Sequence, residues 1–414
     1  MLSKRPLPRI AESERSVSPA LALDRAFISV IAIAFAAAGM KSARAQTCGT
    51  IQDIGRANNA STTVYGVSEH GNVVVGYEYS GTGFTWTPDL GWQAFVVGWL
   101  ADPRAISSGG QVVVGGYVGS STSGRTRAFH WSELYGATDL GTLGGPYDSI
   151  ANGVSADGTT VVGVASPTQG SSRAFRWTSV GGMQDLGSLV PFKPSVATGV
   201  SGDGETVVGH ATNGANRERA FRWTAAGGMQ DLGTLGGVES HAFAISQNGD
   251  VVVGMSLTGS HARAFRWTAS GGMQDLGTLG GSNSMATGVS ADGGVVVGSA
   301  QTSSGLDHAF RWTASGGMQD ISPEESTCTA WAVSPEGDVI VGSYYNAAGQ
   351  TRPFRWVACG CPADFNADGF VNGDDYDAFA ELFDAADPAA DFNADGFVNG
   401  DDYDLFAESF DIGC

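Results

Sequence analysis

The chain has 414 residues and a formal net charge of −20. Fifteen of its 42 acidic residues, and none of its 22 lysines and arginines, lie in residues 361–414, so about three quarters of the net charge belongs to the last eighth of the chain. This argues against nucleic acid or anionic lipid as a partner, because both require clustered cations. The length suits one large repeat fold followed by a small module.

The N-terminus has the pattern of a signal peptide. Five basic residues in the first 25 precede the apolar run "AFISVIAIAFAAAGM" at residues 26–40, and Ala43 and Ala45 fit a cleavage site. We expect residues 1–45 to be removed and the mature protein to be extracellular, secreted or attached to the cell surface. The apolar run is short for a membrane span, and an uncleaved anchor is the alternative.

The middle of the chain, residues 46–360, repeats one unit with a period of about 45 residues. Each unit carries a Phe-x-Trp element, and the tryptophans of these elements are Trp86, Trp131, Trp177, Trp223, Trp267, Trp312 and Trp356. Such a period indicates a supersecondary unit that must stack on its neighbours to bury its faces.

Four short strands are predicted within each unit, because valine-rich runs alternate with Asp-Gly and Gly-Gly turns. Four strands per unit are typical of a propeller blade. The chain begins with "IQDI" at residues 51–54, which matches the last strand of a unit, and the array ends at Trp356 without that strand. The sequence therefore predicts an all-β, seven-bladed β-propeller in which the N-terminal strand completes the last blade and leaves no free edge. A β-solenoid is the alternative.

The chain has five cysteines, which in an exported protein allow at most two disulfides. A Cys48–Cys359 disulfide would rejoin the hairpin that is cut in the closing blade. Cys361 is a competing partner for Cys48, and Cys328 is the expected unpaired thiol.

The units resemble the HAF-type extracellular repeats of bacterial secreted proteins. The resemblance rests on "HAFRW" at residues 308–312 and on "MQDLGTLGG" at residues 229–237 and 273–281, and the repeats cover about 300 residues. It implies an extracellular repeat protein and does not establish a biochemical activity.

Polar residues that recur among the units have a structural interpretation. We expect cross-strand ion pairs between the arginines of the third strands and the aspartates of the fourth, and the serines before the turns to bond nearby backbone. A ring of ligand-binding residues is the alternative for the charged groups. These residues are Arg176, Arg222, Arg266 and Arg311, then Asp185, Asp231, Asp275 and Asp320, and the serines Ser155, Ser201 and Ser290.

Non-repeating residues are the candidates for chemistry, because a nucleophile and an acid must differ in role. Glu239 with His241 is the one acid–base couple considered, and Glu324 would join them as a target if activity were found. Trp92 and Trp99 could form a platform that stacks on sugars, or they could fill a gap in a degenerate repeat. We assign no catalytic and no cofactor-binding residue.

The acidic segment "DFNADGFVNGDDYD" occurs twice, at residues 364–377 and 391–404. It has the ligand spacing of an EF-hand calcium loop, with oxygen donors at positions 1, 3, 5, 7, 9 and 12 and glycine at position 6. We therefore expect two Ca²⁺ ions. The predicted ligands are Asp364, Asn366, Asp368, Phe370 (carbonyl), Asn372 and Asp375, then Asp391, Asn393, Asp395, Phe397 (carbonyl), Asn399 and Asp402.

A helix is predicted after each loop, with aromatic residues at i, i+3 and i+7. These are Tyr376, Phe379 and Phe383 in the first, and Tyr403, Phe406 and Phe410 in the second. The two apolar stripes should face each other and form a core too small to persist without metal, so the calcium is expected to be structural.

Residues 361–414 resemble the dockerin module of cellulosome-type systems, in the variety that ends in Gly-Cys and is seen in planctomycete-like bacteria. The resemblance implies an all-α calcium-binding module, a Cys361–Cys414 disulfide, and attachment to a cohesin-like or cell-surface protein. The sequence departs from the cellulosomal pattern at positions 10 and 11, where Gly373-Asp374 and Gly400-Asp401 replace the usual hydroxyl pair.

Together these features predict a secreted, non-catalytic binding or scaffold protein whose propeller presents a face to a ligand, with carbohydrate as a candidate. The first alternative is an extracellular polysaccharide-degrading hydrolase or lyase that carries a dockerin. The second is a structural envelope protein.

Overall fold

The computed structural model describes residues 49, 51–55, 61–95, 100–119, 122, 124–168, 170–322, 326–358, 365, 373–393 and 396–412. The expected signal peptide, residues 1–45, lies outside these ranges. So do Cys48, Cys359, Cys361 and Cys414, and with them both expected disulfides.

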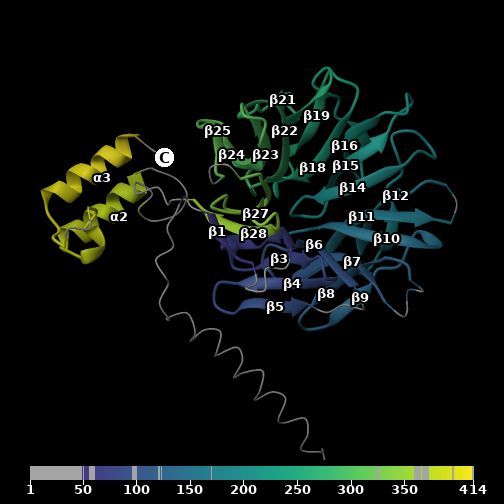
Figure 1. Ribbon diagram of the computed structural model, residues 1–414, viewed down its shortest axis with the longest axis horizontal. Coiled ribbons are helices and arrows are strands. Elements are labelled where there is room, and N and C mark those ends of the chain that lie inside the picture. The colour runs from purple at the N-terminus through teal and green to yellow at the C-terminus, as the bar shows by residue number, and fades with distance from the viewer. Residues whose placement is uncertain are drawn as a thin grey trace, which may run out of the picture. The chain divides into compact units, whose positions relative to one another are not determined.

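Seven four-stranded antiparallel sheets form a β-propeller (Figure 1). We number the blades in chain order, and a short 3₁₀ turn, η2 (Glu69–Gly71), lies within blade 1. Blade 1 contains β2 (Thr62–Val67), β3 (Val74–Glu78), β4 (Thr82–Thr87) and β5 (Gly91–Phe95); blade 2 contains β6 (Leu100–Ile106), β7 (Val112–Val118), β8 (Arg127–Ser132) and β9 (Gly136–Asp139); blade 3 contains β10 (Gly144–Val154), β11 (Thr160–Pro167), β12 (Arg173–Thr178) and β13 (Gly182–Asp185). Blade 4 contains β14 (Ser195–Val200), β15 (Thr206–Thr212), β16 (Glu218–Thr224) and β17 (Gly228–Asp231); blade 5 contains β18 (Ser240–Ile245), β19 (Val251–Thr258), β20 (His261–Thr268) and β21 (Gly272–Asp275). Blade 6 contains β22 (Gly280–Val289), β23 (Val296–Thr302), β24 (Asp307–Thr313) and β25 (Gly317–Asp320); blade 7 contains β26 (Cys328–Val333), β27 (Val339–Tyr345), β28 (Thr351–Val357) and, as its outer strand, β1 (Ile51–Asp53).

The ring closes as the sequence predicts. Strand β1 pairs with β28, with Ile51 opposite Trp356 and Asp53 opposite Phe354. The backbone N–H of Gly49 also donates to the carbonyl of Val357, at 2.9 Å. This bond continues the pairing from Ile51 of β1 to the last residue of β28. The seven-bladed propeller and its permuted closure are confirmed.

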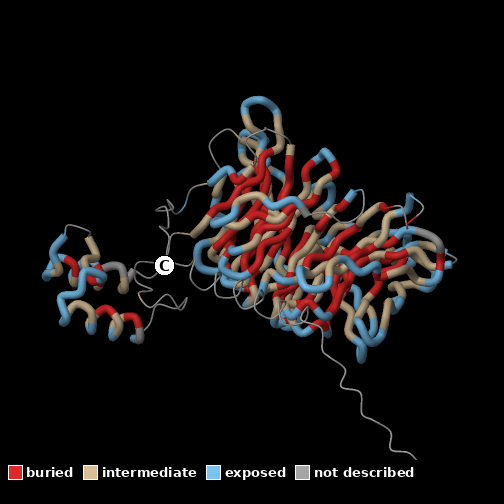
Figure 2. Tube along the Cα trace, turned by 90° about the horizontal axis from the view of Figure 1, so that it is seen from below, coloured by how far each residue is buried: buried red, intermediate tan, exposed pale blue. Residues whose placement is uncertain are grey.

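The core of the propeller lies between successive blades. The phenylalanine of every Phe-x-Trp element is at most 1% exposed, and Phe221 of blade 4, for example, packs in one cluster with Val162 of blade 3. In Figure 2 the buried residues, drawn in red, lie along the strands of the propeller. The glycine after each valine run allows close pairing within a blade, because a Cβ added at Gly163 of β11 would overlap the carbonyl oxygen of Ile150 on β10, next to a bulge in the pairing.

Hydrogen bonds between the inner loops link neighbouring blades around the axis. In six joints a backbone N–H donates to a carbonyl of the next blade. The donor and acceptor pairs are Glu69 and Ser108, Ser108 and Ala156, Ala156 and Gly202, Gly202 and Gln247, Asn248 and Ala291, and Ala291 and Pro335. Pro335 has no N–H to donate across the seventh joint. There the N–H of His70 donates instead to the carboxylate of Glu336, at 3.0 Å.

The C-terminal module contains α2 (Gly373–Asp384), the short 3₁₀ turn η4 (Pro388–Ala390) and α3 (Gly400–Ile412). Its core is aromatic, and the rings of Phe379 and Phe406 stack with centroids 4.1 Å apart and planes within 9°. Tyr376 and Tyr403, which are equivalent in the two repeats, also meet, at 6.1 Å. The expectation that the two aromatic stripes face each other is confirmed.

Candidate functional site

The second acidic loop, residues 391–402, is described except for residues 394 and 395, so the predicted ligand Asp395 lies outside the described residues. The N–H of Gly396 donates to Oδ2 of Asp391, at 2.8 Å, which joins positions 6 and 1 of the predicted calcium loop. Gly396 has φ of 91°, a conformation that favours glycine. The loop therefore makes the sharp bend that the sequence predicts.

Asp402, at position 12, lies at the centre of this loop. It is 0% exposed, and its two carboxylate oxygens accept hydrogen bonds from the backbone N–H groups of Asn393 and Asn399, at 3.1 and 2.8 Å. The bond from Asn399 lowers the pKa of this carboxyl below its usual range, so it is ionised near neutral pH. Phe397, at position 7, is 72% exposed, so its side chain takes no part in the loop's interior.

The first loop is described only at residue 365 and from residue 373 onwards. Asp375, the equivalent of Asp402, is likewise 0% exposed. Five predicted ligands lie outside the described residues: Asp364, Asn366, Asp368, Phe370 and Asn372. In the second loop, the described donors are carboxylate, amide and backbone oxygens, and this set fits a hard cation such as Ca²⁺.

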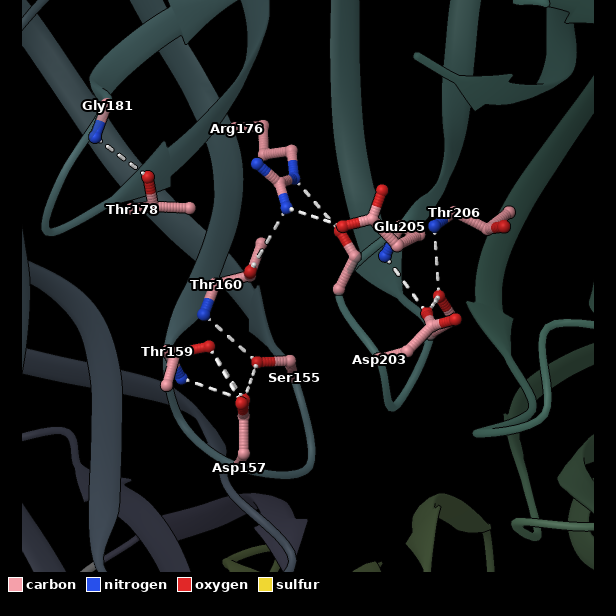
Figure 3. A network of polar contacts seen from close by, with 12 residues as sticks. Ser155, Asp157, Thr159, Thr160, Arg176, Thr178, Gly181, Asp203, Glu205 and Thr206 are labelled. Carbon is pink, nitrogen blue, oxygen red and sulfur yellow. Dashed lines mark hydrogen bonds and ion pairs between the residues drawn. The ribbon is translucent and has the colours of Figure 1, made fainter. Parts of the chain in front are cut away.

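The turns of the propeller use their carboxylates internally. In blade 3, Ser155 Oγ accepts the N–H of Thr160 at 3.0 Å and donates to Asp157 Oδ1 at 2.6 Å (Figure 3). The expected backbone bond of these serines is confirmed in all seven blades, at Ser68, Ser107, Ser155, Ser201, Ser246, Ser290 and Ser334. The hydrogen bond from Ser201 lowers the pKa of the Asp203 carboxyl. These carboxylates stabilise turns.

The expected cross-strand ion pairs of Arg176, Arg222, Arg266 and Arg311 with Asp185, Asp231, Asp275 and Asp320 are wrong. The pairing register places each arginine opposite a glutamine and each aspartate opposite a phenylalanine, so arginine and aspartate lie on opposite faces of the sheet. Arg176 reaches the next blade instead, where its Nε donates to the carbonyl of Gly204 at 2.9 Å and its Nη2 lies 3.3 Å from Glu205 (Figure 3).

In three blades the aspartate lies beside the residue two positions before the phenylalanine. Arg173 Nε lies 3.8 Å from Asp185, and His308 Nδ1 lies 2.7 Å from Asp320. In the closing blade Arg352 Nε lies 3.0 Å from Asp53.

A cavity of about 150 Å³ lies where the inner strands of all seven blades converge. One aliphatic residue from each blade lines it: Val67, Ile106, Val154, Val200, Ile245, Val289 and Val333. Ser108 and Gln247, from blades 2 and 5, also line it, and the Gln247 amide donates to Ser108 Oγ at 2.6 Å. Among the described residues that line this cavity, none is ionisable.

Trp92 belongs to the fold. Its ring stacks on Phe84 with centroids 3.6 Å apart, and its Nε1 donates to the carbonyl of Ile54 at 2.6 Å. It stands opposite Trp86, where blade 3 has Met183 opposite Trp177. This supports the gap-filling interpretation over the sugar platform, and Trp99 lies outside the described residues.

The structure separates Glu239 from His241. Glu239 lies 3.5 Å from Arg217, and His241 Nε2 lies 3.0 Å from Glu218. His210 stacks on His241, with ring centroids 4.6 Å apart. Glu218 and His210 are not predicted as neighbours of His241 from the sequence, because this contact crosses from one blade to the next. Glu324 lies outside the described residues.

No helix among the described residues has the length and hydrophobicity needed to cross a membrane. No protein-family profile and no curated protein matches this chain. Among solved structures, TolB from Acinetobacter baumannii is similar, with 11% identity and a TM-score of 0.42 over 70% of this chain and 78% of that chain. A second similar structure is the putative TolB from Agrobacterium tumefaciens, with 12% identity and a TM-score of 0.41 over 75% of this chain and 97% of that chain.

Proposed function

We propose that the protein is exported and acts as a non-catalytic binding protein with two working parts. The propeller presents a face to an extracellular ligand, and the C-terminal dockerin-like module, folded around two Ca²⁺ ions, attaches the protein to a protein partner or to the cell surface. The single observation that carries this proposal is the geometry of the loop at residues 391–402, where Gly396 bonds to Asp391 and the buried Asp402 gathers two backbone N–H groups.

Calcium in this module has a structural role in our proposal. The aromatic core around Phe379 and Phe406 is small, and the carboxylates of Asp375 and Asp402 are both 0% exposed beside it. Burying ionised carboxylates is costly unless they are paired with a cation. Two Ca²⁺ ions would offset that cost, so binding of the metal and folding of the module should be coupled.

The attachment surface is proposed on α2 and α3. Both helices expose acidic side chains, which suits a partner that offers lysines or arginines. The exposed acids are Asp377, Glu381 and Asp384 on α2, and Asp401 and Asp404 on α3. The near-identical sequences of the two loop–helix units support two equivalent docking faces. A cohesin-like protein or another cell-surface protein is the proposed partner.

The organisation of the propeller supports binding over catalysis. Its recurrent polar side chains form turns and joints between blades, and the axial cavity is lined mainly by aliphatic residues. A carbohydrate is the proposed ligand class, and hydrolysis or lyase activity on polysaccharide is the alternative function.

One experiment separates these functions. The protein beginning at residue 46 is mixed, with excess Ca²⁺, with a panel of insoluble polysaccharides, and retention and release of soluble sugar are measured in the same tubes. Retention without release is expected. Release of sugar would contradict the proposal and direct mutagenesis to Glu239, His241 and Glu324, and co-fractionation with envelope without retention would favour a structural role.

The attachment function is tested separately. The Asp391→Ala variant should lose Ca²⁺-dependent capture by the envelope fraction, whereas Asp89→Ala, which removes an exposed acid from a turn of the propeller, serves as the control for charge. Equal capture of the Asp391→Ala variant and the unmodified protein would overturn calcium-dependent attachment.

A further inference from the structure

Three side chains able to bind a metal ion gather at the joint between blades 4 and 5. His210 lies on β15, Glu218 on β16 and His241 on β18, and one donor atom from each lies within 4.8 Å of the others. His241 Nε2 and Glu218 Oε2 are already 3.0 Å apart. Two imidazoles and one carboxylate are a donor set that suits first-row transition metals.

The strand register accounts for this gathering. His210 stands opposite Ala220 and Glu218 opposite Thr212, so His210 and Glu218 point to the same face of blade 4. That face packs against β18 of blade 5, where His241 stacks on His210 with planes within 25°. The three residues are therefore held by strands rather than by mobile loops, which limits how far they can move apart.

The other joints show what the fold itself requires at these positions. In the six other joints the pairs equivalent to His210 and His241 are Tyr77 and Asp102, Gly116 and Ile150, Val164 and Val196, Met255 and Met285, Ser299 and Thr329, and Ser343 and Thr63. The positions equivalent to Glu218 hold Gly81, Thr126, Ser172, Ala262, Asp307 and Thr351. A joint can thus be packed by an apolar pair or by a hydroxyl pair. An example of the latter is Ser343 and Thr63, whose Oγ and Oγ1 atoms lie 3.0 Å apart. The joint between blades 4 and 5 differs at all three positions at once.

One atom of the cluster lacks a partner. His210 Nδ1 is buried and neither accepts nor donates a hydrogen bond in the described structure, although leaving a buried polar nitrogen without a partner is unfavourable. Glu218, by contrast, is 46% exposed, so the cluster is open to solvent on that side. An ion can therefore enter beside Glu218 and reach the histidines.

We propose that His210, Glu218 and His241 bind one Zn²⁺ ion, or a similar transition-metal ion, which links blades 4 and 5. Three protein ligands leave one position of a tetrahedral zinc site for water or for an oxygen of a bound ligand. The site is distinct from the proposed calcium loops, which offer only oxygen donors and so prefer a hard cation.

The test is calorimetric titration of Zn²⁺ into the protein beginning at residue 46, in excess Ca²⁺. One Zn²⁺ per chain is expected. His210→Gln and His241→Gln should each weaken binding by more than about 100-fold, beyond the 10- to 100-fold loss seen when only a neighbour of a ligand is changed. His261→Gln removes an exposed histidine, and Glu239→Gln removes the adjacent acid that pairs with Arg217; both controls should bind Zn²⁺ normally.

A titration without heat of binding, or equal binding by His241→Gln and the unmodified protein, would overturn the proposal. A second measurement needs no variant that might fail to fold. Electron paramagnetic resonance of the unmodified protein with one equivalent of Cu²⁺ should show coupling to two imidazole nitrogens. Coupling to one nitrogen or none would equally overturn the site.

Discussion

The propeller and the C-terminal module are both built from repeated units, but different interactions hold those units together. Each joint of the propeller buries a phenylalanine against the preceding blade, and the ring is closed by pairing of β1 with β28. The module has one small aromatic core between two helices and two buried carboxylates, Asp375 and Asp402. The propeller can therefore rely on buried apolar surface, whereas we propose that the module relies on bound Ca²⁺ to offset the cost of its buried charge.

This difference teaches that two parts of one chain can owe their folding free energy to different sources, buried apolar surface in one part and a bound metal ion in the other. The propeller should respond to changes in its core and joints and be indifferent to calcium. The module should respond to calcium first and to packing second. The predictions below are ordered by the size of the expected effect.

Removal of calcium should have the largest effect. With a chelator such as EGTA, the helical signal of α2 and α3 in far-ultraviolet circular dichroism should be lost, because the module's folding free energy comes largely from the metal. The β signal and the thermal midpoint of the propeller should stay unchanged. Asp391→Ala should reproduce the loss in the presence of Ca²⁺, and Asp404→Ala should not. Helices that persist in EGTA would contradict the distinction.

Alkylation of Cys328 reports on the propeller alone. Cys328 is a free, buried cysteine, and burial raises its pKa to about 12. Its thiol should resist iodoacetamide at pH 8, with calcium or with EGTA, and react fully in guanidinium, as peptide mass spectrometry can show. Alkylation of the Cys328 thiol in EGTA, without guanidinium, would show that the propeller also depends on calcium.

The pKa of Cys328 also gives the propeller a pH dependence. Because the thiol ionises near its ordinary pKa of 9 when unfolded and near 12 when folded, its contribution to the free energy of unfolding is complete below pH 9 and is lost as the pH rises towards 12.

Asp53→Ala tests the closing blade. Asp53 accepts two hydrogen bonds from Arg352, at 3.0 and 3.1 Å, and one from the hydroxyl of Tyr344, at 3.0 Å. Arg352 is 5% exposed, so loss of this carboxylate should destabilise the propeller by about 3 kcal/mol in guanidinium unfolding. Asp89→Ala, which removes an exposed turn acid, should change stability by less than about 0.5 kcal/mol. Equal effects would mean that closure does not depend on this contact.

The smallest effects should have opposite signs at equivalent hydroxyls. Ser195 Oγ accepts the N–H of Ala174 and donates to the carbonyl of Gly187, so Ser195→Ala should cost about 1–2 kcal/mol. Thr62 occupies the same place next to blade 7, but its Oγ1 is buried without a partner, because Pro353 stands where Ala174 does and has no N–H. Thr62→Val should therefore be neutral or stabilise by about 1 kcal/mol in the same assay. Destabilisation by both variants would contradict this account.

Much of the fold could be predicted from the sequence, because the pattern of four short strands with a Phe-x-Trp element recurs in seven units. The period of the tryptophans fixed the number of blades, and the strand at residues 51–54 fixed the closure. The turn serines were also predictable, since Ser155 and its equivalents act on backbone within five residues. Local chemistry of this kind needs no knowledge of the neighbouring blade.

Contacts set by register or by neighbouring blades could not be predicted. Arg176 was assigned to Asp185 because both lie in one hairpin, yet Asp185 stands opposite Phe175, and a shift of one residue moves a side chain to the other face. His241 has Glu239 two residues away in sequence, but its partners are Glu218 and His210, which belong to the preceding blade. A comparison of equivalent positions across all repeats would have singled out these three residues.

The missing N–H groups of two prolines have a consequence for how the ring comes apart. Pro335 cannot donate around the axis, and Pro353 cannot donate to Thr62, so the joint between blades 7 and 1 lacks two bonds that most of the other joints possess. Blade 7, on one side of that joint, is also the blade that the first strand, β1, completes by pairing with the last strand, β28. We expect it to act as a seam, the place where the closed ring opens first under load or heat, with amide hydrogen exchange fastest along β2 and β28.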